Sequence, residues 1–128
     1  MRHLFLFILF VVLSTSIQAQ YSTLKEESGV SVSTKWTKEK WYKPKSNKLL
    51  AVKLDNTTDT DVVVSFELVI YQNGVNKEMV EVEKKVIKAH SNLVGKWNGI
   101  SFVPQKISQE DIAAGNYEIV IEEWKWSR

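Results

Sequence analysis

The chain has 128 residues, of which 17 are Lys or Arg and 15 are Asp or Glu, with two histidines and no cysteine. This length suits a single domain, and the nearly balanced charge gives no support for nucleic-acid binding. Without cysteine the protein has no disulfide, no thiolate nucleophile and no cysteine-ligated metal site.

The first twenty residues have the pattern of a secretory signal peptide. A short basic start precedes an apolar run over residues 4–13, and a polar stretch then ends in the small residue Ala19. Ten helical residues span about 15 Å, too short for the roughly 30 Å hydrocarbon core of a bilayer. We therefore predict a signal peptide over residues 1–19, export to the periplasm or the cell exterior, and no membrane span in the mature chain.

Alternating apolar and polar residues dominate the rest of the chain, which is typical of half-buried β-strands. Residues 20–28 are polar and are predicted to be a flexible leader to a domain over residues 29–128. The alternation predicts strands at 29–36, 48–55 and 62–71. The residues expected to face inward are Val30, Val32, Thr34 and Trp36 in the first strand, Leu50, Val52 and Leu54 in the second, and Val62, Val64, Phe66, Leu68 and Ile70 in the third.

A tight hairpin is predicted next, because Asn73-Gly74 lies between two alternating segments and both residues can adopt positive φ. The return strand covers about residues 76–88. Lys84-Lys85 in its middle indicates a break, a bulge or an edge protected by charge. The residues expected on one side of this strand are Val80, Val82 and Val86.

Two further strands and a helical turn complete the predicted domain. One strand is expected around residues 93–103 and the last over 116–126. Between them, Ser108 with an acidic residue three positions later, Asp111, predicts a short helix near residues 108–114. Six or seven short strands favour an all-β sandwich or barrel. The inward residues of the last strand are predicted to be Tyr117, Ile119 and Ile121.

Two parts of this pattern resemble immunoglobulin-like and fibronectin type III-like domains of bacterial exported proteins. The first is Asp111-Ile-Ala-Ala-Gly115-Asn-Tyr117, because an acidic residue, a glycine turn and an inward tyrosine precede a core strand in those families. The second is the hairpin of residues 50–56 and 62–66. The resemblance implies one antiparallel immunoglobulin-like β-sandwich, mostly a binding, adhesion or spacer module. The usual final strand is missing unless residues 97–103 or the first strand replace it.

The sequence offers little to a catalytic mechanism. His90, the single histidine outside the leader, lies in a predicted turn and is interpreted as solvated. Neighbouring carboxylates on one strand cannot face each other across a cleft. The oxygen-bearing side chains of Asp55, Asn56, Asp59 and Asp61 could bind calcium, but they lack the spacing and the glycine of the usual loop. We predict a protein that is not an enzyme and uses neither metal nor cofactor.

Lysine and aromatic residues gather in the first half of the chain. Residues 35–48 interleave three large aromatics with six lysines and one acid. Residues 21–53 carry eight lysines and three acids, whereas 54–128 carry eight basic and twelve acidic residues. Rings flanked by lysines suit an anionic polysaccharide, lipid headgroups or an acidic protein. The alternative is that the rings belong to the core and the lysines cover its edges.

The Trp124-Lys125-Trp126 segment raises the same question at the C-terminus. The alternation places both indoles on the outer face unless a bulge switches the register. The leading hypothesis is an exported, non-catalytic binding module for a protein or glycan of the cell envelope. The alternative is a structural or accessory subunit, an inhibitor or assembly partner, that pairs by a strand edge. The candidate ligand-binding residues are Trp36, Trp41, Tyr42, Lys43, Trp124 and Trp126.

Overall fold

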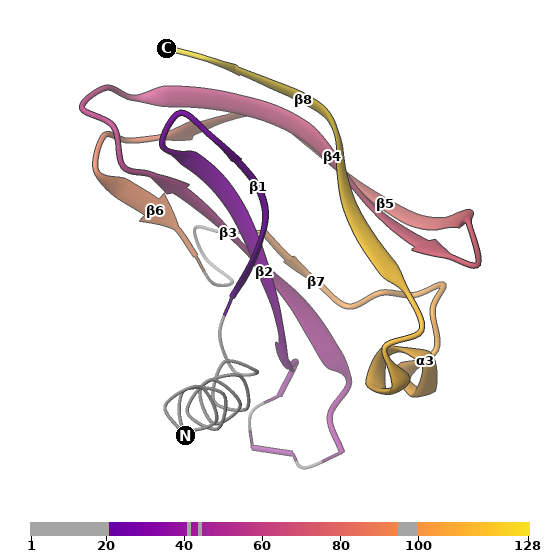
Figure 1. The fold of residues 1–128 in the computed structure, drawn as a ribbon. Helices are drawn as coiled ribbons and strands as arrows, with labels where there is room; N and C mark the ends of the chain where they lie inside the picture. The colour runs from indigo at the N-terminus through magenta and orange to yellow at the C-terminus, as the bar shows by residue number, and fades with distance from the viewer. Residues whose placement is uncertain (1–20, 41, 44, 95–99) are drawn as a thin grey trace, which may run out of the picture.

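Two antiparallel sheets face each other and enclose the hydrophobic core (Figure 1). The computed structural model describes residues 21–40, 42–43, 45–94 and 100–128. Sheet A contains, in spatial order, β1 (Ser22–Glu27), β2 (Val30–Lys38) and β3 (Lys48–Asn56), with both β6 (Ser91–Leu93) and β7 (Ile100–Phe102) pairing to the far side of β3. Sheet B has the order β5 (Val75–Ile87), β4 (Val62–Gln72) and β8 (Glu118–Ser127). The predicted all-β sandwich is confirmed.

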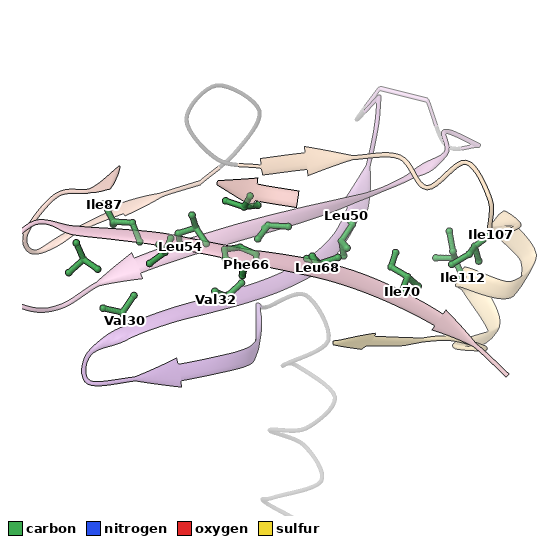
Figure 2. Packing of buried hydrophobic residues seen from close by; sticks show 14 residues of the cluster. Val30, Val32, Leu50, Leu54, Phe66, Leu68, Ile70, Ile87, Ile107 and Ile112 are labelled. Atoms are coloured by element: carbon green, nitrogen blue, oxygen red, sulfur yellow. The ribbon is translucent and has the colours of Figure 1, made fainter. Parts of the chain in front are cut away.

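The core lies between the inward faces of the two sheets, as Figure 2 shows. The alternation predicted for β4 is confirmed, since all five inward residues are at most 2% exposed. Val30, Val32 and Thr34 of β2 are also buried. Ile107 and Ile112 close the core at the end near helix α3 (Gln109–Ala114).

The N-terminal hairpin corrects one prediction. Residues 20–28 were expected to form a flexible leader, but residues 22–27 form strand β1, which pairs with β2. The turn at Ser28-Gly29 has φ of 52° and 86°, and the carbonyl of Gly29 accepts hydrogen bonds from Thr57. An edge strand with mostly exposed polar side chains resembles a linker in sequence, which explains the wrong prediction. The predicted signal peptide, residues 1–19, lies outside the described residues.

Local turn and cap signals are confirmed. Asn73 and Gly74 have φ of 54° and 77° and join β4 to β5 in a two-residue hairpin. Helix α3 begins after Ser108, whose hydroxyl accepts the backbone N–H of Asp111 at 3.1 Å, and ends at Gly115 in the left-handed conformation. Where a single strand was predicted around residues 93–103, the structure has two short strands, β6 ending at Leu93 and β7 over Ile100–Phe102, with residues 95–99 outside the described part of the chain.

A β-bulge divides β5. Its pairing with β4 shifts between Val64–Lys85 and Phe66–Val82, and Lys84 at the bulge has φ of 50°. The backbone N–H of Lys84 donates to the hydroxyl of Ser65 at 2.9 Å. Past the bulge the side chains exchange faces, so the prediction that Val86 lies on the same side as Val80 and Val82 is wrong. Val86 is 46% exposed, and its neighbour Ile87 is buried instead. Two of the three alternatives for Lys84-Lys85 are observed, since the bulge lies on a strand at the edge of sheet B.

None of the described helices is long and apolar enough to span a membrane.

Candidate functional site

Trp36, a predicted ligand-binding residue, connects the two sheets at one end of the sandwich. Its indole Nε1 donates a hydrogen bond to the Tyr117 hydroxyl at 2.6 Å. The two rings meet edge to face, with centroids 5.5 Å apart and an interplanar angle of 75°. The indole is half-buried and packs against the core. Trp36 therefore stabilises the fold through these contacts, and part of its ring remains exposed at the surface.

Trp124 and Trp126 are turned toward the core by a second bulge. The pairing of β8 with β4 shifts between Ser65–Lys125 and Glu67–Glu122, and Glu123 has φ of 52°. Of the two alternatives for these indoles, the register switch is the one observed: both are half-buried and pack against the core cluster. They cover the core and do not form a fully outward aromatic platform.

The polar edge of Trp124 also joins β8 to β1. Its Nε1 donates to a carboxylate oxygen of Glu27 in β1 at 2.7 Å. On the core side its ring lies against Phe66, with centroids 5.8 Å apart. The guanidinium of Arg128 lies 5.6 Å from the ring centroid of Trp126. In these contacts both indoles interact with side chains of the same domain.

Tyr42 and Lys43 lie on the loop between β2 and β3. The tyrosine is 61% exposed, and the Lys43 ammonium lies 6.0 Å from its ring centroid. Trp41, the remaining candidate, lies outside the described residues. The structure does not bring the predicted residues together, because three cover the core while two lie on this loop.

A different basic surface lies on the outer face of sheet A. We call it the basic face, and it is a shallow depression of about 490 Å³ across β1, β2 and β3. The Lys35 and Lys53 ammonium groups lie 4.8 Å and 5.6 Å from the ring centroid of Tyr21. The basic face is lined by Tyr21, Thr23, Ser31, Ser33, Lys35, Lys53 and Asp55.

The alternation of β2 forms the floor of this depression. Because Val30 and Val32 point into the core, Ser31, Ser33 and Lys35 point outward. Short hydroxyl side chains keep the centre of the face low, and the hydroxyls of Ser33 and Thr23 lie 3.4 Å apart. None of these residues is among the ligand-binding residues predicted from the sequence. The outward hydroxyls that alternate with core valines were the signal that could have identified them.

The basic face presents positive charge to solvent. Within the described residues Lys88 forms an ion pair with Asp61 and the His90 ring contacts Asp59, whereas neither Lys35 nor Lys53 pairs with a carboxylate. Both ammonium groups lie near the tyrosine ring, where cation–π attraction holds them. Two cations beside hydroxyl donors can bind an anionic group that also offers hydroxyls.

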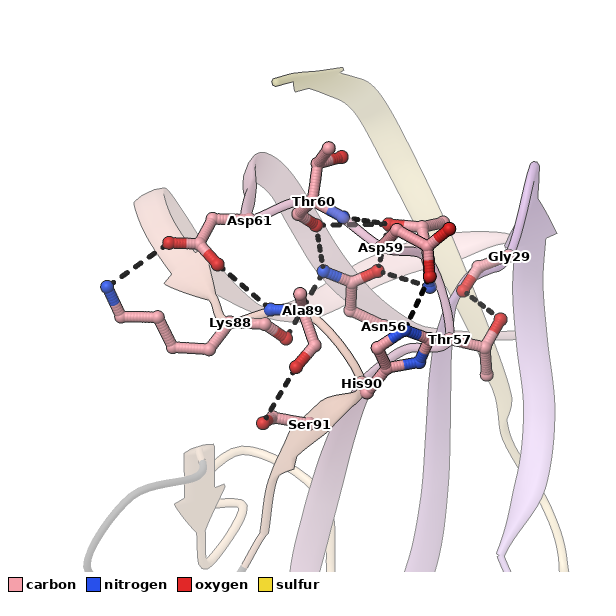
Figure 3. Close-up of polar contacts among 11 residues, drawn as sticks. Gly29, Asn56, Thr57, Asp59, Thr60, Asp61, Lys88, Ala89, His90 and Ser91 are labelled. Carbon is pink, nitrogen blue, oxygen red and sulfur yellow. Dashed lines mark hydrogen bonds and ion pairs between the residues drawn. The ribbon is translucent and has the colours of Figure 1, made fainter.

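The polar loop between β3 and β4 is held by hydrogen bonds to the β5–β6 turn (Figure 3). The His90 Nε2 and an Asp59 oxygen are 2.6 Å apart, and both side chains are exposed. Asp61 accepts the Ala89 N–H at 2.9 Å and the Lys88 ammonium at 3.2 Å. His90 lies in the predicted solvated turn. These acidic side chains bind protein groups from the neighbouring turn.

Asp61 makes stability depend on acid pH. The Ala89 N–H and then the Lys88 ammonium hold the pKa of Asp61 below its ordinary value of 3.8. Folding therefore favours the charged form of Asp61. The resulting contribution to the stability of the fold is present above about pH 4 and is lost as pH falls through the lowered pKa. We expect Asp61→Asn to lower the urea midpoint at pH 7 and to converge with wild type near pH 2. Parallel curves for the two proteins would contradict this assignment.

No three His, Asp or Glu side chains gather closely enough to hold a metal ion within the part of the chain that the structure describes. No protein-family model, curated protein or solved structure matches this chain. The resemblance to immunoglobulin-like domains therefore stays a prediction from the sequence, and function must be inferred from the surfaces of the fold.

Proposed function

We propose that this protein is an exported, non-catalytic binding module that recognises an anionic glycan of the cell envelope through the basic face. The observation that supports this function is the placement of Lys35 and Lys53 over the Tyr21 ring beside a row of hydroxyl groups. Export is the expectation from the predicted signal peptide over residues 1–19.

The chemistry of the basic face favours an anionic sugar over an apolar ligand. The hydroxyls of Ser31 and Thr23 can exchange hydrogen bonds with sugar hydroxyls, and the two ammonium groups can bind carboxylates. Ser33 is buried beneath them, with its hydroxyl beside that of Thr23. Asp55 at the edge of the face disfavours an acidic group there, so it gives the ligand a preferred orientation. Shallow, wet surfaces of this kind suit an extended chain of sugars.

Charge reversal on the basic face tests the proposal. We expect Lys35→Glu with Lys53→Glu to weaken binding to polygalacturonate roughly tenfold at low salt, since two exposed ion pairs contribute up to about 1 kcal/mol each. Binding is measured by isothermal titration calorimetry on the mature protein, with uncharged dextran as the reference polysaccharide. Added salt is expected to weaken wild-type binding as well.

The matched control introduces the same change of charge at two lysines outside sheet A. Lys77→Glu with Lys106→Glu alters two exposed lysines and gives the same net charge. Binding by this control is expected to stay within about twofold of wild type, because neither lysine lines the basic face. Equal losses in both double variants would show that net charge alone attracts the polysaccharide, and the proposed site would be wrong.

A further inference from the structure

One long edge of sheet B is open. β8 pairs with β4 along one side, and among the described strands none pairs with its other side (Figure 1). β1 reaches β8 at the bulge, where Glu27 accepts the hydrogen bond from Trp124. The edge nearer the start of β8 keeps backbone N–H and C=O groups that a further strand could bind.

An apolar groove lies beside this part of β8. It has a volume of about 280 Å³ and lies between β1 and β2 on one side and the start of β8 on the other. Its apolar wall consists of Leu24, Trp36, Tyr117 and Ile119. All four side chains are half-buried, and the last three also pack against the core. The remaining residues at the groove are Ser22, Thr34 and Lys35.

We propose that the free edge of β8 accepts a β-strand from a partner protein, and that this strand alternates aliphatic with basic residues. Added beside β8, the strand would direct every second side chain toward the groove. The groove is about twice the roughly 150 Å³ that accommodates one benzene molecule, so it has room for aliphatic side chains. This inference concerns a different surface from the basic face and does not rest on it.

The charge of sheet B selects the other side chains of the incoming strand. Glu122 of β8 lies directly opposite Glu67 of β4, and Glu67 lies opposite Glu81 of β5, so one row of the outer face carries three carboxylates. No Lys or Arg of the described chain forms an ion pair with them. Like charges directly opposite each other are unfavourable, and a basic residue on an added strand would relieve this.

The same row binds a neighbouring tyrosine. The Tyr71 hydroxyl donates to Glu122 at 2.5 Å, and this bond is the main cause that raises the pKa of Tyr71 above its ordinary value of 10.0. The nearby carboxylates of Glu118 and Glu67 act in the same direction. The outer side of β8 is therefore negative where an added strand would lie.

Charge also argues against a second copy as the occupant. Two β8 edges paired with each other would bring the Glu118 and Glu122 carboxylates of both copies toward a shared acidic surface. A strand with lysine or arginine at its outward positions meets that surface favourably. The partner is therefore a different protein with an amphipathic basic strand.

Synthetic peptides test the proposal directly. The probe is a ten-residue peptide that alternates valine and lysine. Its binding to the full mature protein is measured by fluorescence anisotropy, and the protection of the protein's amides is measured by hydrogen exchange. We expect binding together with slower exchange of the β8 amides that do not bond to β4. N-methylation of the peptide amides that face β8 should weaken binding at least roughly tenfold, because several backbone hydrogen bonds are lost. A valine–glutamate peptide should bind more weakly still.

Matched variants locate the site. Glu118→Lys at the start of β8 should weaken binding of the valine–lysine peptide by about threefold or more, while Glu83→Lys on the opposite edge strand β5 changes it less. Equal binding of the N-methylated peptide, or unchanged exchange in β8, would overturn the proposal. A dimer joined through β8 in analytical ultracentrifugation would also overturn it, because a second copy would then occupy the edge.

Discussion

Replacing Phe66 with alanine is expected to lower the free energy of unfolding by about 3–5 kcal/mol. The ring is 2% exposed in the central strand of sheet B and packs on the indole of Trp124. Val82 lies opposite on β5, and both neighbouring strands carry their bulges beside this position. Alanine would remove the contact with Trp124 and leave a cavity in the core. Urea denaturation followed by tryptophan fluorescence measures the change.

A neighbouring substitution provides the control. Glu67→Gln changes the next residue of β4, whose side chain points to the outer face between Glu81 and Glu122. We expect an unchanged or slightly higher stability, within about 0.5 kcal/mol, because one of three facing carboxylates loses its charge. A loss at position 66 no larger than at 67 would show that the ring is not central to the core.

Replacing Asn56 with alanine is expected to cost about 3 kcal/mol, since each buried group left without a partner costs about 1–3 kcal/mol. Asn56 is fully buried at the end of β3. Its Nδ2 donates to the carbonyl of Thr60 at 2.8 Å (Figure 3). The same nitrogen donates to the carbonyl of Ile87 at 3.0 Å, while the Oδ1 accepts from the Thr58 backbone N–H at 2.9 Å. One amide therefore joins the β3–β4 loop to the end of β5.

The aspartate variant separates the donor from the acceptor role. Asn56→Asp keeps the acceptor for Thr58 but turns a carboxylate toward the carbonyls of Thr60 and Ile87, so we expect it to be at least as destabilising as alanine. Hydrogen exchange should show faster exchange of the Thr58 amide in the alanine variant. Exposed Asn92 on β6 supplies the control, with a change within about 0.5 kcal/mol on substitution by alanine. A similarly small effect at Asn56 would contradict its structural role.

The features that sequence reasoning predicted correctly are local ones. Five inward residues of β4, the Asn73-Gly74 turn and the Ser108 cap each depend on a few adjacent residues. Their physical causes, alternation, positive φ and side-chain capping, are properties of the segment itself. Strands β2, β3 and β4 therefore formed where the pattern placed them.

The features that it missed depend on neighbours distant in the chain. The bulges at Lys84 and Glu123 lie on either side of the same part of β4, and each reverses the faces of the residues after it. Nothing in the local alternation chooses between a bulge and an uninterrupted strand, so Val86 was placed wrongly and Trp124 was left open. β1 was missed for a similar reason, because its polar residues become a strand only beside β2. Tyr21, which lies on the basic face immediately before β1, was missed for the same reason.

The hydrogen bond between Glu27 and Trp124 has a consequence for the order in which the domain can form. The two residues are 97 positions apart, and they join β1, the first of the described strands to leave the ribosome, to β8, the last of them. Contacts of such large sequence separation carry a high entropic cost of closure and form late. A chain that emerges from its N-terminus can pair β1 with β2 early, but the sandwich closes at this edge only after Trp124 has been released.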